Sequence, residues 1–185
     1  MERRLNHSRK PASHRTLAGL LLAMGLATVA GTAGADVANV TINGTIDAGT
    51  CTISAGDVNK NVTLATIKTS DLPAAGGVAA LQNVTLTVNN CDVGLTTASF
   101  TFTGTPDDTD KVRWKNTGSA QGVAVELESS AGVPIGADGT NNQLMAQITG
   151  GQAVLTFQAG YWHLPGVTAT SGSVSAVATV NTSYN

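Results

Sequence analysis

The stretch from Ala38 to Cys51, Ala-Asn-Val-Thr-Ile-Asn-Gly-Thr-Ile-Asp-Ala-Gly-Thr-Cys, has apolar residues or glycine at its even positions as far as Ile46, with polar residues between them. This period of two is typical of a β-strand with one buried face. Gly44 weakens the strand and indicates close approach to other atoms. A second run of the same period, from Gly172 to Tyr184, lies at the other end of the sequence. We interpret the two runs as strands that pair between different copies of the molecule.

Residues 1–35 have the pattern of a cleaved secretory signal: five basic residues, an apolar run from Leu17 to Val29, and small residues ending in Ala35. The apolar run has 13 residues, too few to cross a bilayer core of about 30 Å. Cleavage after Ala35 leaves 150 residues (185 − 35), a natural size for one domain. A retained membrane anchor is the alternative interpretation.

The mature chain has five Lys and Arg against eleven Asp and Glu, a net charge of −6. A nucleic-acid partner is not expected, because a phosphate backbone requires a basic face. Only Cys51 and Cys91 are present, and export places them in an oxidising compartment, so we predict one disulfide. It closes a loop of 41 residues (91 − 51 + 1), worth roughly 4 kcal/mol in chain entropy. Two free buried thiols are the alternative, which the signal argues against.

Short alternating runs separated by glycine-rich turns predict an all-β protein. The predicted strands are residues 62–67, 84–88 leading into Cys91, 100–103, 123–128, 154–158 and 174–184. Those at 100–103 and 123–128 are expected to be half buried, and residues 105–110 and 137–142 to be surface loops. Six or seven such strands in about 150 residues predict an antiparallel sandwich.

Residues for catalysis are sparse. His163 is the only histidine of the mature chain, and with no free cysteine a catalytic triad is hard to assemble. We therefore expect a loop histidine, no enzyme activity, no catalytic residue and no cofactor.

Two further groups of residues could bind a ligand. Asp107, Asp108 and Asp110 could ligate calcium, but they lack the ligand spacing of an EF-hand loop, and we favour a solvated acidic loop and no metal. Trp114 and Trp162 could form an apolar platform for a sugar or a partner, or they could fill the core.

Association is the function that the sequence supports. The sandwich is one strand short beside its last strand, and such an edge exposes unpaired backbone groups and apolar side chains. A strand lent by a neighbour resolves this. The run from Ala38 to Ile46 has the right form for the lent strand.

The whole mature length resembles the subunits of chaperone–usher pili, close to type 1 fimbrial subunits. The features that carry the resemblance are the amino-terminal alternation around Gly44, the cysteine pair, residues 100–104 (Phe-Thr-Phe-Thr-Gly), and a tail with Gly172 fourteenth from the end and Tyr184 next to last. The resemblance implies an incomplete immunoglobulin-like sandwich that lacks its last strand. It also implies a periplasmic chaperone that lends a strand in transit and an outer-membrane usher that exchanges it for the next subunit's extension.

Carried over to this chain, the resemblance divides it into a signal (1–35), a donor-strand extension (36–49) and a pilin domain (50–185). The donor residues would be Ala38, Val40, Ile42, Gly44 and Ile46. The acceptor groove and chaperone-binding strand would be formed by Gly172, Val174, Ala176, Ala178, Val180, Thr182 and Tyr184. Thr182 departs from the family, which usually has a larger apolar residue there, so the resemblance implies a shallower groove at that end.

The predicted function is a structural subunit of a surface fimbrium, exported through the periplasm, that polymerises with neighbouring subunits by strand exchange and supports adhesion. The main alternative is a polymeric adhesin that also binds a host ligand on its face. Exposure of Trp114 and Trp162 on one surface would favour the adhesin, and their burial would favour the shaft subunit. A periplasmic enzyme is a third hypothesis, which predicts a cleft with His163 next to an acidic residue.

Overall fold

The computed structural model describes residues 49–185. The predicted signal and the donor residues Ala38 to Ile46 lie outside the described residues. Within the described part, no helix is long and apolar enough to cross a membrane.

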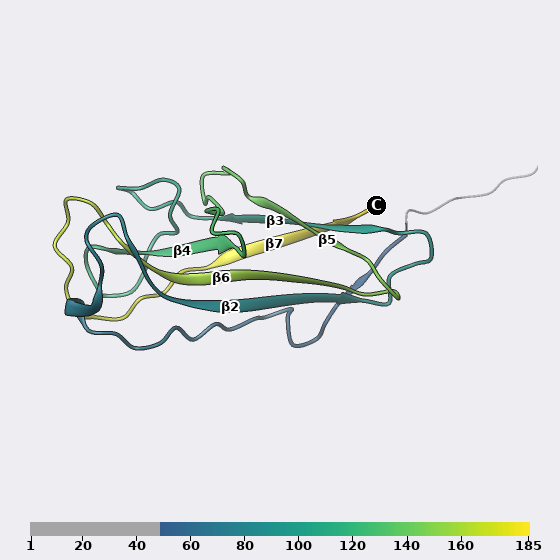
Figure 1. The fold of residues 1–185 in the computed structure, drawn as a ribbon, viewed down its shortest axis with the longest axis horizontal. Coiled ribbons are helices and arrows are strands. Elements are labelled where there is room, and N and C mark those ends of the chain that lie inside the picture. Colours follow the sequence, from purple (N-terminus) through teal and green to yellow (C-terminus); the bar gives the residue numbers. More distant parts are fainter. Residues whose placement is uncertain (1–48) are drawn as a thin grey trace, which may run out of the picture. The chain divides into compact units, whose positions relative to one another are not determined.

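The first of two antiparallel sheets contains β1 (Thr52–Ile53), β2 (Val78–Asn89), β6 (Ala153–His163) and β4 (Val123–Ser129), in the order β1-β2-β6-β4 (Figure 1). Its register is fixed by apolar residues that alternate along both central strands, so that Val84 lies opposite Phe157 and Leu86 opposite Leu155. A shift of one residue would turn these side chains out of the core. The strands predicted at 84–88 and 154–158 are confirmed as the inner parts of longer strands.

The second sheet contains β5 (Gln143–Gln147), β3 (Thr97–Gly104) and β7 (Ala178–Tyr184), in the order β5-β3-β7 (Figure 1). Phe100 lies opposite Thr182 and Phe102 opposite Val180. In residues 49–185 the one helical element is a 3₁₀ turn, η1 (Thr69–Asp71). The all-β sandwich is therefore confirmed.

The core lies between the two sheets and is formed by the inward residues of β2, β3, β4 and β6. The rings of Phe102 and Phe157 meet edge to face with centroids 5.1 Å apart, which joins one sheet to the other. Trp114 is 1% exposed, and its indole nitrogen donates to the Ile135 carbonyl oxygen at 2.8 Å. Of the two interpretations of Trp114, the structure supports the core filler.

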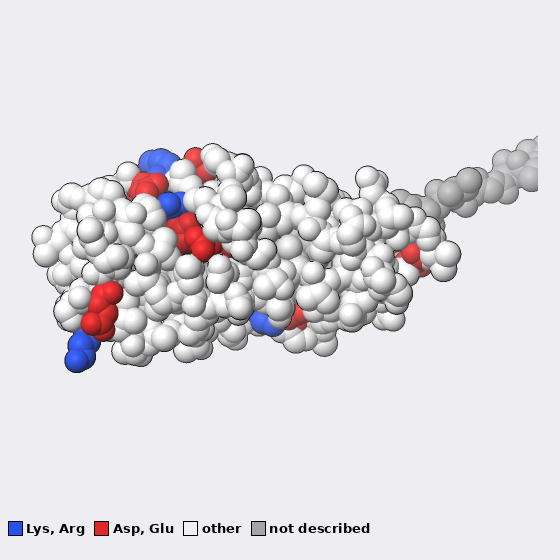
Figure 2. All heavy atoms as spheres, in the orientation of Figure 1, with Lys and Arg blue, Asp and Glu red and all other residues white. Residues whose placement is uncertain are grey.

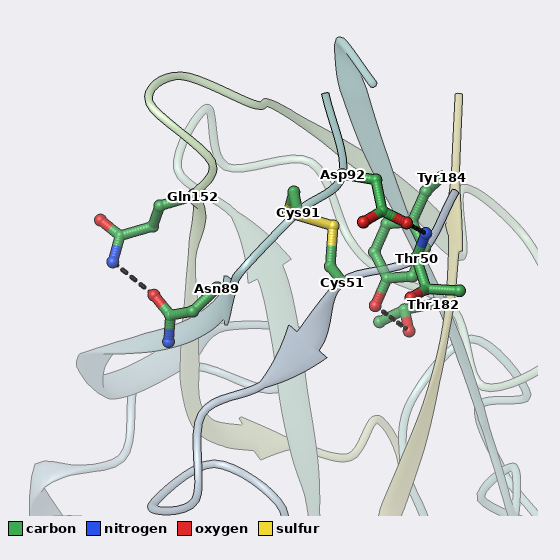
Figure 3. Close-up of a disulfide and its surroundings, with 8 residues drawn as sticks. All are labelled: Thr50, Cys51, Asn89, Cys91, Asp92, Gln152, Thr182 and Tyr184. Carbon is green, nitrogen blue, oxygen red and sulfur yellow. Dashed lines mark hydrogen bonds between the residues drawn. A yellow bond between two sulfur atoms is a disulfide. The ribbon is translucent and has the colours of Figure 1, made fainter. Parts of the chain in front are cut away.

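The predicted disulfide between Cys51 and Cys91 is present and joins the residue before β1 to the chain just after β2 (Figure 3). Two hydrogen bonds flank it. The Thr50 backbone nitrogen donates to Asp92 Oδ2 at 2.7 Å, and Gln152 Nε2 donates to Asn89 Oδ1 at 2.6 Å. The cross-link thus holds the start of the described chain against the end of β2.

Four predictions need correction. Residues 62–67 form no strand, and the strand predicted at 174–184 begins only at Ala178, because β3 has no residue beyond Gly104 to pair with the earlier part. His163 is not in a loop but ends β6, where Gly77 accepts a hydrogen bond from its backbone nitrogen. The strand at 123–128 is buried on both faces rather than half buried.

A covered pair of charges explains the burial of the outer face of β4. Glu126 is 1% exposed, and Arg113 Nε lies 2.7 Å from its Oε2. The Arg113 guanidinium also stacks on the Trp162 ring, 3.7 Å from its centroid, a favourable cation–π contact. Asp110 Oδ2 is 3.9 Å from the same Nε atom, and Glu128 is buried nearby on β4. Figure 2 shows a cluster in which both signs of charge mix, on a face with few other charged side chains.

Glu126 makes stability depend on pH. Burial raises the pKa of its carboxyl to about 7, the Arg113 charge lowers it, and the Glu128 and Asp110 carboxylates raise it further. The folded chain therefore holds this proton more tightly than the unfolded chain, whose glutamate titrates near 4.5. The stabilisation is complete below that value and is lost as the pH rises through 7.

We expect the free energy of unfolding, measured by urea titration at pH steps from 4 to 8, to fall over this range with a slope that Glu126→Gln reduces. Glutamine has the same shape but does not titrate. An unchanged slope in the variant would contradict this assignment of the pH dependence to Glu126.

Candidate functional site

One side of the sandwich has two strand edges without a strand partner in the described part of the chain. β7 pairs with β3 on one side only. β2 has β1 beside it only at Val88 and Asn89, so most of its outer edge also carries no strand. Exposed strand edges of this kind bind further strands readily.

Three neighbouring cavities, of about 470, 630 and 520 Å³, lie along this side. The first and third are lined by β2 and β7, and the second continues between residues 66–72 and 170–174. The first shares Tyr161 and Val174 with the second, and Ala176, Ala178 and Val180 with the third. We call the three together the groove. Core residues of both sheets form its floor: Val84, Leu86, Phe100, Phe102, Val125, Leu127 and Phe157.

The wall of the groove on the β7 side is formed by residues from the end of the chain. The groove is lined by Val174, Ala176, Ala178, Val180 and Thr182. Gly172 lines the cavity of about 630 Å³. Residues 174, 176, 180, 182 and 184 are half buried, whereas the odd-numbered residues from 175 to 183 are exposed. The alternation of this tail is therefore present in the structure except at Ala178, which is exposed.

Thr182 and Tyr184 give this wall a polar end. The Thr182 hydroxyl lies 2.9 Å from the Tyr184 hydroxyl, and the close-up around the disulfide includes this hydrogen bond (Figure 3). Tyr184 also packs against the core. The threonine that departs from the family pattern thus has a specific partner.

The opposite wall is formed by the segment of residues 57–68, of which 62–67 were predicted as a strand without being placed in the site. Residues 61–64 line the cavity of about 470 Å³ together with Ala178 and Val180 of β7. Among the described residues, the backbone of 58–67 makes no hydrogen bond to other backbone groups. Side chains fix it instead: Tyr161 donates to the Ala65 carbonyl at 3.1 Å, and Asp57 Oδ2 accepts from the Thr87 nitrogen of β2 at 2.8 Å.

Position 172 requires glycine because the backbone there lies very close to the backbone of Ala120. A Cβ atom at this position would lie 2.8 Å from Ala120 Cα and closer still to the Ala120 nitrogen. Real Cβ atoms do not come this near to backbone, so the two segments fit only because residue 172 has no side chain.

Gly172→Ala should therefore push the first part of the β7 wall away from Ala120 and lower the free energy of unfolding by about 1–3 kcal/mol, the usual cost of overpacking. The matched control is Gly56→Ala, because a Cβ at Gly56 meets nothing within 4 Å. Urea unfolding of both variants checks this, and equal midpoints for the two would contradict the close-approach argument.

The other candidate residues lie outside the groove. His163 Nδ1 is 2.7 Å from the Pro73 carbonyl oxygen, a backbone group rather than the acidic side chain that the enzyme hypothesis predicts. The loop aspartates bond within their own surroundings: Asp107 Oδ1 accepts from the Thr109 nitrogen at 2.8 Å, and Asp108 pairs with Lys115. In residues 49–185 no three acidic, histidine or cysteine side chains are grouped to hold a metal.

The two tryptophans do not share an exposed surface. Trp114 is in the core, and the indole nitrogen of the half-buried Trp162 is itself buried. This arrangement favours a shaft subunit over an adhesin with an aromatic platform.

A two-sheet sandwich with an open, apolar groove beside its last strand defines a class of protein: the incomplete immunoglobulin-like fold. Comparison with known proteins agrees. The profile of the family described as Fimbrial protein matches residues 40–185, so the chain belongs to this family. It is a fimbrial subunit, a structural protein that assembles with other subunits into a surface fimbrium.

Individual relatives support the assignment. FimG of Escherichia coli K12 is 34% identical over 114 residues, which cover 62% of this chain and 66% of FimG. The laminin-binding fimbrial subunit ElfA of Escherichia coli O157:H7 is 32% identical and covers 79% and 83%. The type 1 fimbrial subunit of Klebsiella pneumoniae is 29% identical and covers 92% and 98%.

A solved structure is similar in fold. The P pilus rod subunit PapA is 23% identical, with a TM-score of 0.62 over 73% of this chain and 99% of PapA. The resemblance inferred from the sequence is confirmed.

Proposed function

We propose that this subunit polymerises by donor-strand exchange, in which residues 38–46 of one copy fill the groove of the next. The observation that carries the proposal is the groove itself, an apolar channel along β7 whose floor is the hydrophobic core. A strand with one apolar face is the ligand that fits such a channel, because its backbone pairs with the free edge while alternate side chains enter the pockets.

Both walls of the groove can take part. The outer edge of β7 offers backbone groups on one side, and the backbone of residues 61–67 lies on the other with no backbone partner among the described residues. The alternating sequence of residues 62–67 suits this segment to pair with an inserted strand. An inserted strand would give this segment a neighbour, and we expect it to become a strand in the assembled fibre.

Apolar burial supplies the affinity. Burying Val40, Ile42 and Ile46 yields about 1.5–3 kcal/mol each, roughly 5–9 kcal/mol before the cost of ordering the extension. By the family resemblance, Gly44 would sit at the pocket that accepts only a glycine. Backbone pairing along β7 adds to this gain.

The same groove explains the need for other partners during export. Before assembly it leaves core residues and a strand edge open to aggregation. A periplasmic chaperone that lends a strand, followed by exchange at an outer-membrane usher, would keep the groove covered at every step. In this proposal residues 1–35 direct export and are removed, residues 36–49 form the extension, and residues 50–185 form the pilin domain.

A second candidate function is a fimbrial subunit that also binds a host ligand. The relative described as laminin-binding favours it. The burial of Trp114 and of the Trp162 nitrogen argues for the shaft role, since neither offers an aromatic platform.

The proposal predicts that a copy of residues 36–47 moved from the front of the chain to a position behind Asn185, through a short flexible linker, yields a soluble monomer. The relocated strand fills the groove of its own molecule, so sedimentation should show one species with a higher unfolding midpoint than the mature chain. The mature chain purified without a chaperone should aggregate or polymerise.

The matched control has the same relocated segment with Val40, Ile42 and Ile46 changed to threonine, which keeps length and strand propensity but removes the large apolar side chains. It should remain unstable. A mature chain lacking residues 36–47 that is already a stable monomer would refute the proposal.

A further inference from the structure

The β7 side of the groove is held in two different ways along its length. Residues 178–184 are the strand β7 and pair with β3. Residues 170–177 have no such strand and bond instead to residues 116–121, which we call the support loop. The Thr117 nitrogen donates to the Ser175 carbonyl at 2.8 Å, and the Ala120 nitrogen donates to the Ser173 carbonyl at 3.0 Å.

The support loop is not a regular strand, and one side chain maintains its shape. Asn116 Oδ1 accepts from the Gly118 nitrogen at 2.8 Å, and Asn116 Nδ2 donates to the Ala120 carbonyl at 2.9 Å. These two bonds tie the start of the loop to its middle and its end. They replace the backbone ladder that the loop lacks.

The same amide reaches across to the groove. Asn116 Oδ1 also accepts from the Ser175 backbone nitrogen at 3.0 Å. Ser175 lies between Val174 and Ala176, both of which line the groove. One half-buried side chain therefore connects the fold of the support loop to the position of the groove wall.

The support loop and residues 172–175 are packed so closely that neither segment can shift without moving the other. A Cβ atom at Gly118 would overlap the Ser173 carbonyl, and one at Gly172 would overlap the Ala120 backbone. The two segments touch backbone to backbone. A change in the loop is thus transmitted directly to residues 172–176.

We propose that Asn116 is a positioning residue for strand insertion: it fixes the support loop, which holds residues 170–177 at the spacing that an incoming strand requires. The inference rests on the proposed function, because it assigns a role in donor-strand binding to a residue outside the groove. It adds that the two halves of the β7 wall have different supports: backbone pairing with β3 holds one, and bonds to the support loop, whose shape Asn116 maintains, hold the other.

The test uses the whole chain, refolded with an excess of a fluorescent synthetic peptide of residues 36–47. Release is then followed after addition of unlabelled peptide. Asn116→Ala should release the peptide on the order of tenfold faster. The lost hydrogen bonds together contribute a net free energy close to the one that corresponds to a tenfold change in affinity. In hydrogen exchange, the amides of residues 173–175 should exchange faster, while those of residues 179–184 keep their wild-type rates.

Asn142→Ala is the matched control. Asn142 Nδ2 also donates to a backbone carbonyl, that of Phe102 at 3.0 Å, but on the β5 side of β3. It should leave peptide release unchanged. Equal release rates for the Asn116 and Asn142 variants, or faster exchange throughout β7, would overturn the inference.

Asn116→Asp decides the question if the alanine variant does not refold. Aspartate retains both acceptor bonds, loses the bond to Ala120 and places a carboxylate oxygen against that carbonyl, so release faster than wild type supports the role and wild-type release overturns it. Failure of the wild-type chain to capture the peptide at all is a different result, and it would contradict the proposed function rather than the role of Asn116.

Discussion

Backbone hydrogen bonding along β7 is satisfied on one side only. β3 pairs with β7 from Ala98 opposite Tyr184 to Gly104 opposite Ala178, and within the described chain no strand lies on the other side. Buried backbone groups are almost always paired in folded proteins, so this edge cannot be both covered and unpartnered. Every distinctive feature of the molecule relates to that constraint.

The rest of the sandwich compensates for the open side. The sheet of β2, β6 and β4 has long, well-registered pairs, and the contact of Phe102 with Phe157 joins the two layers. The disulfide between Cys51 and Cys91 anchors the chain where it enters this sheet. These elements allow the groove to remain open without loss of the core beneath it.

The distribution of charged side chains also favours the binding of an apolar strand in the groove. The groove is lined mainly by apolar and uncharged polar side chains, and its charged lining residues are Asp57, Lys60 and Lys68. The buried pair of Glu126 and Arg113 lies instead on the outer face of β4. A strand that enters the groove therefore meets a surface on which burial of apolar side chains gains the most.

Much of the architecture follows from local pattern. Alternation at 84–88, 100–103 and 154–158 predicts strands that the structure contains, because each has one face on the core. The disulfide between the two cysteines is likewise present. In these places a period of two is sufficient, since a single buried face decides the outcome.

The predictions that the structure corrects fail where a partner decides the structure. Residues 62–67 have a strand pattern but no strand to pair with among the described residues. Glu126 has the pattern of an exposed residue, and only the position of Arg113, thirteen residues earlier in the chain, explains its burial. The contacts of Asn116 with residues 118, 120 and 175 leave no trace in periodicity, because they join side chain to backbone across a turn.

Electron cryomicroscopy of the assembled fibre tests the central claim most directly, because it locates the strand that completes each sandwich. The account predicts continuous density between β7 and residues 61–67 of every subunit, with a register that assigns it to residues 38–46 of the neighbouring subunit. Density in that place belonging to the same subunit, or a groove closed by direct pairing of β7 with residues 61–67, would contradict it.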